Sequence, residues 1–131
     1  MLDPDPPPLR LRYLDVLASA QGARAHPLPL LLYTAASPEL LSNLPYGPAS
    51  DVWALGCILY ETCTLEHPFD AKNFPSLAFK ILNEHPSPIA GRSAELPPLV
   101  HAALVKDPAR RAPLHALLAT PIVQRRMRAF V

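Results

Sequence analysis

Glycine and lysine are both scarce in this chain of 131 residues. The glycines are too far apart to form a glycine-rich loop of the kind that wraps a phosphate group. The lysines are scattered as well, and the net charge is only +1. The chain therefore has no electrostatic reason to bind nucleic acid or an anionic membrane surface, and neither partner is predicted. The residues concerned are Gly22, Gly47, Gly56, Gly91, Lys72, Lys80 and Lys106.

Cysteine and recognisable metal-site patterns are equally rare. Cys57 and Cys63 lie six positions apart on one predicted helix and on different faces, so an intrachain disulfide is not expected. None of the five histidines has the spacing to a second histidine or to a cysteine that zinc sites use. We therefore assign no metal ligand and predict a reducing, cytoplasmic location.

No targeting or anchoring segment is recognisable either. Asp3 and Asp5 stand where a signal peptide would carry basic residues. The apolar run Leu28–Tyr33 is too short for a membrane span, which needs about 20 apolar residues. A membrane partner is therefore not predicted.

Proline, by contrast, is abundant, with 18 residues, and the composition changes near residue 36. Residues 1–36 contain no Lys, Glu, Asn, Ile, Phe, Trp or Cys, whereas residues 37–131 use all of these. We predict a boundary here, with a disordered arm over Asp3–Pro8 and a helix over Leu9–Gln21 in the first segment. The segment could instead come from an alternative exon or from an error in gene prediction, because its residues are those that GC-rich codons specify. The apolar side of the predicted helix carries Leu11, Leu14, Leu17 and Ala18.

The stretch Asp51–Cys63 predicts a helix at the centre of a fold. Its apolar residues leave no polar stripe at a spacing of 3.6 residues, so every side of the helix would be apolar. Ser50 and Asp51 stand where an N-cap would lie, and Gly56 would allow another backbone to approach closely. Periodicity alone would also fit a core helix of an unrelated all-α domain. The side chains expected to be among the most buried are Trp53, Leu55, Ile58 and Leu59.

Short motifs in a fixed order narrow the choice of fold. Ser37-Pro38-Glu39 precedes the apolar helix, and His67-Pro68-Phe69 and Lys106-Asp107-Pro108-Ala109-Arg110-Arg111 follow it. Together they resemble the large lobe of the NIMA-related serine/threonine protein kinases, with Ser37 in place of the Ala of an Ala-Pro-Glu element. The resemblance covers residues 37–131. It implies an all-α fold, a helical fragment of the large lobe (C-lobe) with the N-terminal lobe absent.

The resemblance gives four residues structural roles. In the family, the Arg that matches Arg111 pairs, buried, with the Glu that matches Glu39, so we expect a close ion pair here. The counterpart of Asp51 accepts backbone hydrogen bonds from the catalytic loop. Without that loop, Asp51 is expected to cap its own helix or to contact water. Trp53 is expected in the core.

The parts that carry kinase chemistry are missing from the sequence. Phosphoryl transfer needs a Gly-rich loop, a strand Lys, a catalytic-loop Asp, and Asp and Asn ligands for magnesium. The chain has no His-Arg-Asp and no Asp-Phe-Gly, and Leu31–Ala36 differs from the Gly-Thr-Pro-Tyr-Tyr-Leu-like stretch of the family. We therefore assign no catalytic, cofactor-binding or metal-binding residue. Magnesium-ATP is implied only for the complete family domain.

The other segments predict helices joined by Pro-rich turns. The predicted helices are residues 74–83, 93–105, 113–119 and 121–130. Pro113 suits a first helical position, although the family usually has Pro and then Ser or Thr directly after the residue that matches Arg111. The last helix carries Arg125, Arg126 and Arg128, which form either a solvated face or a docking patch for an acidic partner.

Three functions follow from these observations. The first is a partial serine/threonine kinase domain whose family transfers the ATP γ-phosphate to protein Ser or Thr, but which is inactive as this chain. The second is a non-catalytic docking or regulatory module that binds kinase substrates or regulators through the helices after Phe69. The third is a part of a longer gene product with no independent function.

Overall fold

A computed structural model describes residues 34–91 and 93–130. Within these residues the fold is all-α, with six helices and no strand, which confirms the predicted fold class. None of these helices is long and apolar enough to cross a membrane. The predicted arm Asp3–Pro8 and helix Leu9–Gln21 lie outside the described residues. The helices are α3 (Pro38–Leu41), α4 (Pro48–Thr64), α5 (Phe74–Asn83), α6 (Leu96–Ala103), α7 (Leu114–Leu118) and α8 (Pro121–Ala129).

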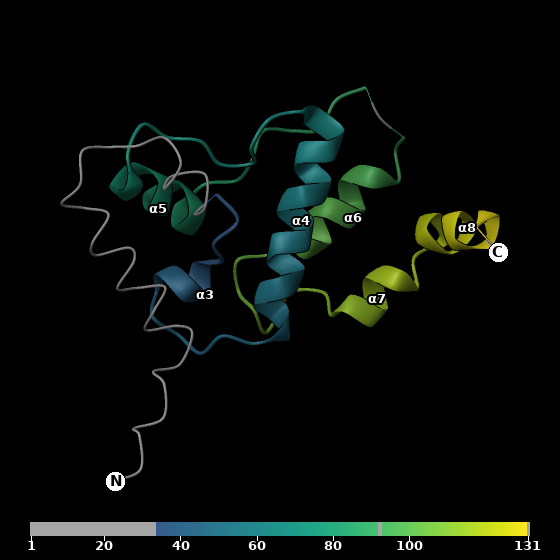
Figure 1. Ribbon diagram of the computed structural model, residues 1–131, viewed down its shortest axis with the longest axis horizontal. Coiled ribbons are helices and arrows are strands. Elements are labelled where there is room, and N and C mark those ends of the chain that lie inside the picture. The colour runs from purple at the N-terminus through teal and green to yellow at the C-terminus, as the bar shows by residue number, and fades with distance from the viewer. Residues whose placement is uncertain (1–33, 92, 131) are drawn as a thin grey trace, which may run out of the picture.

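Helix α4 is the longest and stands in the middle of the molecule, with α3 and α5 on one side and α6 and α7 on the other (Figure 1). It starts three residues before the predicted Asp51, because Pro48 occupies the first turn, where its fixed φ favours helix and its missing N–H costs nothing. The N-cap is Gly47, so the prediction that Ser50 or Asp51 caps the helix is wrong. Leu65 ends the helix with φ 60°, in the left-handed conformation common at helix ends.

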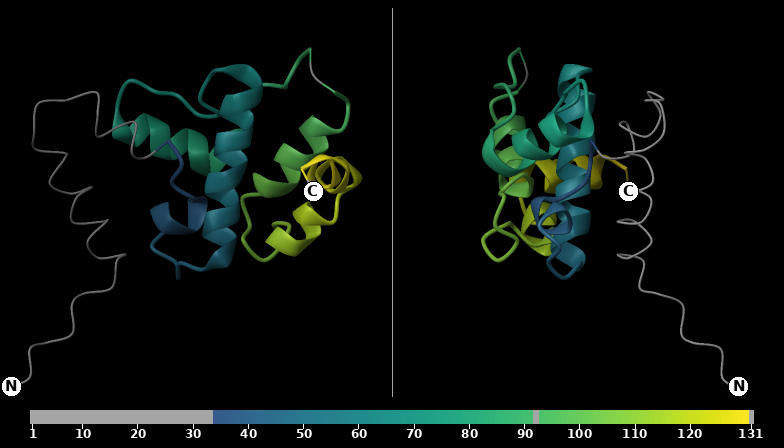
Figure 2. Two further views of the ribbon diagram at one scale, coloured as in Figure 1. Left: turned by 45° about the vertical axis from the view of Figure 1, so that its right-hand side comes forward. Right: turned by 90° about the vertical axis from the view of Figure 1, so that its left-hand side faces the viewer.

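Gly56 is where α6 crosses α4. A Cβ atom at Gly56 would lie 2.8 Å from Cβ of Ala103 and 2.9 Å from Cδ2 of Leu104. The three nearest atoms belong to the side chains of Ala103 and Leu104, at the end of α6, and none of them is a backbone atom of the kind expected to approach this glycine. The two views of Figure 2 also show α6 beside α4.

Two groups of apolar side chains form the core around α4. Trp53 is completely buried, as expected, and stacks on Phe69 with ring centroids 5.9 Å apart. Buried residues of the first group are Trp53, Cys57, Tyr60, Phe69, Leu77, Ile81, Val100 and Leu104. The second group is Val52, Leu99, Ala103 and Leu117.

The expectation that Leu55, Ile58 and Leu59 rank among the most buried residues is wrong. Ile58 is 58% exposed, and Leu55 and Leu59 are half-buried. The reason is geometric, because the described helices pack on two sides of α4 and leave a third side open. An apolar helix sequence does not state how many of its sides have neighbours.

The smaller helices follow the predicted segments with shifted ends. Helix α5 has the predicted bounds, and its N-cap Asn73 accepts a hydrogen bond from the backbone N–H of Ser76 over 2.9 Å. Helix α6 is shorter than predicted by three residues at its start and two at its end. Pro113 is the N-cap of α7 and not its first helical residue.

Candidate functional site

The best-defined polar site is an ion pair between Glu39 and Arg111, two residues 72 positions apart in the sequence. Glu39 lies on α3, and Arg111 lies in the loop between α6 and α7. The guanidinium donates from Nη1 to Oε1 over 2.7 Å and from Nη2 to Oε2 over 2.9 Å. Both side chains are almost fully buried, with 0% and 1% exposure. The expected close pair is therefore present, in the bidentate form that makes Arg–carboxylate contacts strong.

Every N–H of the Arg111 guanidinium has an acceptor. Nε donates to the carbonyl oxygen of Val105 over 2.7 Å, and Nη1 also donates to that of Ala49 over 2.6 Å. Nη2 also donates to the carbonyl oxygen of Lys106 over 3.1 Å. A guanidinium has five N–H groups, and all five are used here. The pair thus ties α3, the first turn of α4 and the loop after α6 to one another.

The carboxylate of Glu39 is held in its charged form. Burial on its own would raise the pKa of Glu39, but the hydrogen bonds that it accepts, led by that from Arg111, outweigh burial and lower the pKa from 4.5 to about 2. The hydroxyl of Ser50 is one of the donors, over 2.9 Å to Oε1. Ser50 is the third residue of α4, so it lies inside the helix and its hydroxyl is available to Glu39.

Two cations lie over the aromatic rings behind the ion pair. Cζ of Arg111 is 5.1 Å from the ring centroid of Trp53, and Nζ of Lys106 is 5.6 Å from it. The same Nζ is 4.8 Å from the Phe69 ring and donates to the carbonyl oxygen of Ile81 over 2.5 Å. Burial lowers the pKa of Lys106. These are cation–π distances, and they connect the ion pair directly to the core.

Sequence reasoning missed Lys106 and Ser50 as partners in this site. Lys106 is in the quoted motif, but nothing in its spacing places its side chain over two rings. Ser50 was assigned to a helix cap.

Asp51 lies near this pair but takes no part in it. Its carboxylate is exposed and accepts a hydrogen bond from the hydroxyl of Tyr46. That bond is the first cause of a raised pKa of Tyr46. Of the two outcomes expected for Asp51, exposure to water holds and capping of its own helix does not.

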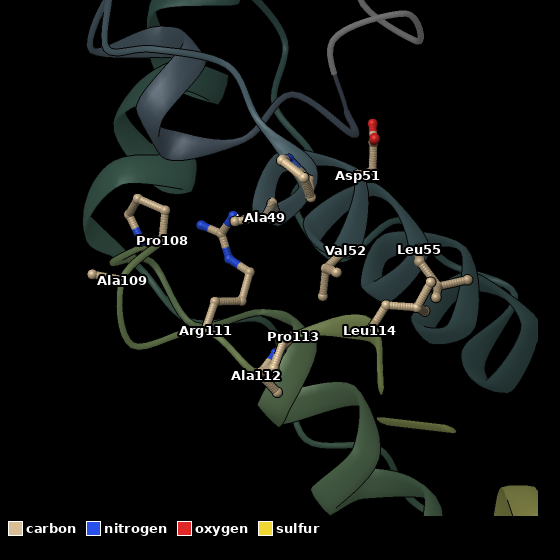
Figure 3. Close-up of a pocket in the computed structure, with 11 residues that line it drawn as sticks. Ala49, Asp51, Val52, Leu55, Pro108, Ala109, Arg111, Ala112, Pro113 and Leu114 are labelled. Atoms are coloured by element: carbon tan, nitrogen blue, oxygen red, sulfur yellow. Dashed lines mark hydrogen bonds between the residues drawn. The ribbon is translucent and has the colours of Figure 1, made fainter. Parts of the chain in front are cut away.

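A groove of about 540 Å³ opens between the first half of α4 and the loop that carries Arg111. Figure 3 shows Leu55 and Leu114 at one end of it, and the carboxylate of Asp51 pointing away from Arg111. Since Arg111 is neutralised by Glu39, the groove wall itself is mostly apolar. Its lining residues are Pro48, Ala49, Asp51, Val52, Leu55, Pro108, Ala109, Arg111, Ala112, Pro113 and Leu114.

Residues 34–91 and 93–130 contain no group of three or more His, Cys, Asp or Glu side chains close enough to hold a metal ion. His67 is engaged instead by Glu61, with 2.7 Å between Nδ1 and Oε1. Cys57 and Cys63 are both free of disulfides, and burial raises the pKa of the Cys57 thiol to about 12, so that thiol is unreactive. The ion pair of Glu39 and Arg111 therefore holds α3, α4 and the loop after α6 together.

Comparison with known proteins agrees with this architecture. A family model described as the protein kinase domain matches residues 31–123. The chain is 40% identical over 89 residues to human serine/threonine-protein kinase Nek5, covering 67% of this chain and 13% of that protein. It is 40% identical over 96 residues to mouse Nek4, covering 72% of this chain and 12% of Nek4. It is 46% identical over 83 residues to mouse Nek3, covering 62% of this chain and 16% of Nek3. The chain thus spans only a small part of the length of these relatives.

Proposed function

The chain belongs to the protein kinase family, in its NIMA-related branch, and we propose that residues 37–131 form the part of a serine/threonine kinase large lobe that runs from the end of the activation segment to the last helices. The observation that carries this proposal is the buried pair of Glu39 and Arg111. It joins the two motifs that the family places at opposite ends of this part of the lobe. Glu39, Arg111, Asp51 and Trp53 have structural roles in this proposal.

We further propose that the chain alone transfers no phosphate. Catalysis of phosphoryl transfer consists mainly of positioning the nucleotide and stabilising charge on the transferred group. The sequence supplies no glycine-rich loop, no His-Arg-Asp and no Asp-Phe-Gly. Asp51 and Asp107 do not replace the missing carboxylates. The carboxylate of Asp51 accepts a hydrogen bond from the Tyr46 hydroxyl. The carboxylate of Asp107 accepts a hydrogen bond of 2.9 Å from the backbone N–H of Ala109, within a turn.

Two measurements on residues 1–131 test this absence of activity. Titration calorimetry with magnesium-ATP should give no saturable heat, and a radiolabelled transfer assay with a generic protein substrate should give no labelled product. Human Nek5, prepared with its complete kinase domain, serves as the positive control. Saturable nucleotide binding, or transfer that is abolished by changing one carboxylate of this chain, would show that the chain is a divergent enzyme.

A second candidate function is a non-catalytic docking module for kinase partners. Exposed apolar side chains on helices after Phe69 favour it, since Phe79 on α5 is 59% exposed and Phe130 after α8 is 92% exposed. Large exposed apolar side chains often mark contact surfaces. Calorimetry with the complete kinase domain of human Nek5 tests this function. Binding that is weakened by Phe79→Ala and not by Lys72→Ala would support docking through α5, and no binding would contradict it.

The chain is also proposed to act in the cytoplasm. The support is that Cys57 and Cys63 form no disulfide with each other, which suits a reducing compartment. Imaging of the full chain fused to a fluorescent protein tests this location. Fluorescence confined to secretory compartments would contradict it.

A further inference from the structure

A hydroxyl residue directly precedes proline at three places in the chain, in Ser37-Pro38, Ser87-Pro88 and Thr120-Pro121. Such a dipeptide suits a kinase with an apolar pocket behind the acceptor hydroxyl, because proline has no N–H that would be left unpaired there. The same dipeptide is also a common helix start, since Ser and Thr suit the N-cap and Pro suits the first helical position. The sequence alone does not separate the two uses.

Two of the three dipeptides begin helices. Ser37 is the N-cap of α3 and is 0% exposed. Thr120 is the N-cap of α8, and its hydroxyl donates to the carbonyl oxygen of Leu117 over 2.7 Å. In both cases the chain turns into a helix directly after the hydroxyl residue, so it cannot run extended through an active-site cleft. The fold therefore accounts for these two dipeptides.

The third dipeptide, Ser87-Pro88, begins no helix. It lies in the loop between α5 and α6, and residues 84–90 contain neither helix nor strand. Ser87 and Pro88 are both exposed. Prolines stand on both sides of Ser87, and a residue that precedes proline is confined to extended backbone conformations. The loop thus presents an accessible hydroxyl in an extended stretch, as transfer to that hydroxyl inside a cleft requires.

The core fixes this loop without using the Ser87 side chain. The hydroxyl of Tyr60, a residue that is 3% exposed, donates to the backbone carbonyl oxygen of Ser87 over 2.9 Å. Two residues further on, Ile89 packs against the core group that contains Tyr60. A segment that is already ordered loses little conformational entropy when it binds a partner. The contact with Tyr60 uses only the backbone of Ser87, so a change at the exposed hydroxyl leaves it intact.

We propose that Ser87 is a phosphorylation site for a separate serine/threonine kinase that selects proline directly after the acceptor. Oγ of Ser87 attacks the γ-phosphorus of an ATP molecule that the other kinase holds. A bond forms between Oγ and this phosphorus, the bond from the phosphorus to the oxygen of the β-phosphate breaks, ADP leaves, and the hydroxyl proton passes to the catalytic carboxylate of that kinase. The product carries a charge of about −1.5 to −2 on the loop. The chain is the substrate in this reaction, so the proposal does not depend on whether the chain itself transfers phosphate.

Phosphorylation of the full chain tests the proposal. Residues 1–131 are incubated with radiolabelled magnesium-ATP and a purified mitogen-activated protein kinase, a proline-selective enzyme, and the labelled residues are identified by mass spectrometry. We expect label at Ser87 at least about tenfold faster than at Ser37 or Thr120, because those two hydroxyls become accessible only when the structure around them opens. Ser87→Ala should remove most of the label. The matched control Ser37→Ala should leave the label unchanged.

Synthetic peptides show whether the fold or the local sequence makes this selection. Peptides of residues 82–91 and 34–43 contain Ser87-Pro88 and Ser37-Pro38 without the fold, and both should be labelled at similar rates. A peptide of residues 34–43 that is labelled as slowly as Ser37 in the full chain would overturn the argument from burial. Full chain without label at Ser87, equal rates at Ser87 and Ser37 in the full chain, or label that persists in Ser87→Ala would each overturn the proposed site.

Discussion

The two sides of α4 have different surroundings. On one side, Trp53, Cys57 and Tyr60 are at most 3% exposed and contact α6 and the segment around Phe69. On the other side, Ile58 is 58% exposed and Leu55 lines an open groove. Packing among residues 34–91 and 93–130 therefore covers the first side of α4 more completely than the second.

Polar chemistry separates the same two sides. Glu39 and Arg111 are buried next to Trp53 and have all their strong hydrogen-bonding groups matched. Asp51, on the side of Ile58, is exposed and accepts a hydrogen bond from the hydroxyl of Tyr46. Charges near the buried side should therefore control stability, whereas the charge of Asp51 should affect it little. The predictions below test this difference, starting with the largest expected effect.

Truncation of the buried cation should have the largest effect. Arg111→Ala would leave the carboxylate of Glu39 buried without its partner, and we expect a loss of about 3 to 5 kcal/mol in the free energy of unfolding. Arg125→Ala is the matched control, because Arg125 pairs with Glu95 at the surface with 56% and 44% exposure. That control should cost less than about 1 kcal/mol. Urea denaturation followed by tryptophan fluorescence measures both, and similar losses in the two variants would contradict a buried pair that stabilises the fold.

Acid should weaken the same pair by a comparable amount. The pKa of Glu39 is about 2 in the folded chain and 4.5 as its ordinary value. Since the folded pKa is the lower one, its contribution is complete above about pH 4.5 and is lost as the pH falls toward 2. The contribution is roughly 3 kcal/mol, from about 1.4 kcal/mol per pKa unit.

The acid prediction is measured by urea denaturation at several pH values between 2 and 6. Glu39→Gln removes the titrating group, so its stability should fall less steeply over this range than that of the unchanged chain. Identical pH slopes for the two proteins would show that the carboxylate of Glu39 is not selectively stabilised in the folded state.

The sequence predicted some features of the fold and of the site, and other features could not be predicted from it. The pairing of Glu39 with Arg111 followed from the similarity of two motifs to a known family, and the structure contains it. The bounds of α5 followed from apolar residues at helical spacing, which begin with Phe74. The exposure of Ile58 could not be predicted, because a helix that is apolar all round gives no phase to its buried side. The position of Lys106 over two rings depends on how distant segments meet, and local sequence does not encode that meeting.

A methyl group at Gly56 should have a smaller effect than loss of the ion pair. It would meet Cβ of Ala103 at 2.8 Å, and this atom has no freedom to move without shifting α6. Overpacking of this kind costs about 1 to 3 kcal/mol, and the better helix propensity of Ala offsets up to about 1 kcal/mol of that. We expect Gly56→Ala to lower the thermal midpoint. Gly47→Ala is the control, since nothing lies within 4 Å of its added Cβ. Because Gly47 is the N-cap of α4 and Ala is a poorer N-cap, its midpoint should fall, but by less than that of Gly56→Ala.

The smallest effect is expected at Asp51, on the exposed side of α4. Asp51→Asn removes a negative charge from the first turn of α4. The carboxylate of Asp51 accepts a hydrogen bond from the Tyr46 hydroxyl, but the side chain is exposed. A negative charge near a helix N-terminus contributes about 0.3 to 1 kcal/mol at low salt, so the loss in unfolding free energy should stay below about 1 kcal/mol and should shrink further in high salt. Glu39→Gln, measured in the same buffers, removes a carboxylate of the same charge from the buried side and should cost several times more, with little dependence on salt. If Asp51→Asn proved as costly as Glu39→Gln, the carboxylate of Asp51 would have to be buried by a part of the chain beyond the described residues, and the contrast between the two sides of α4 would not hold.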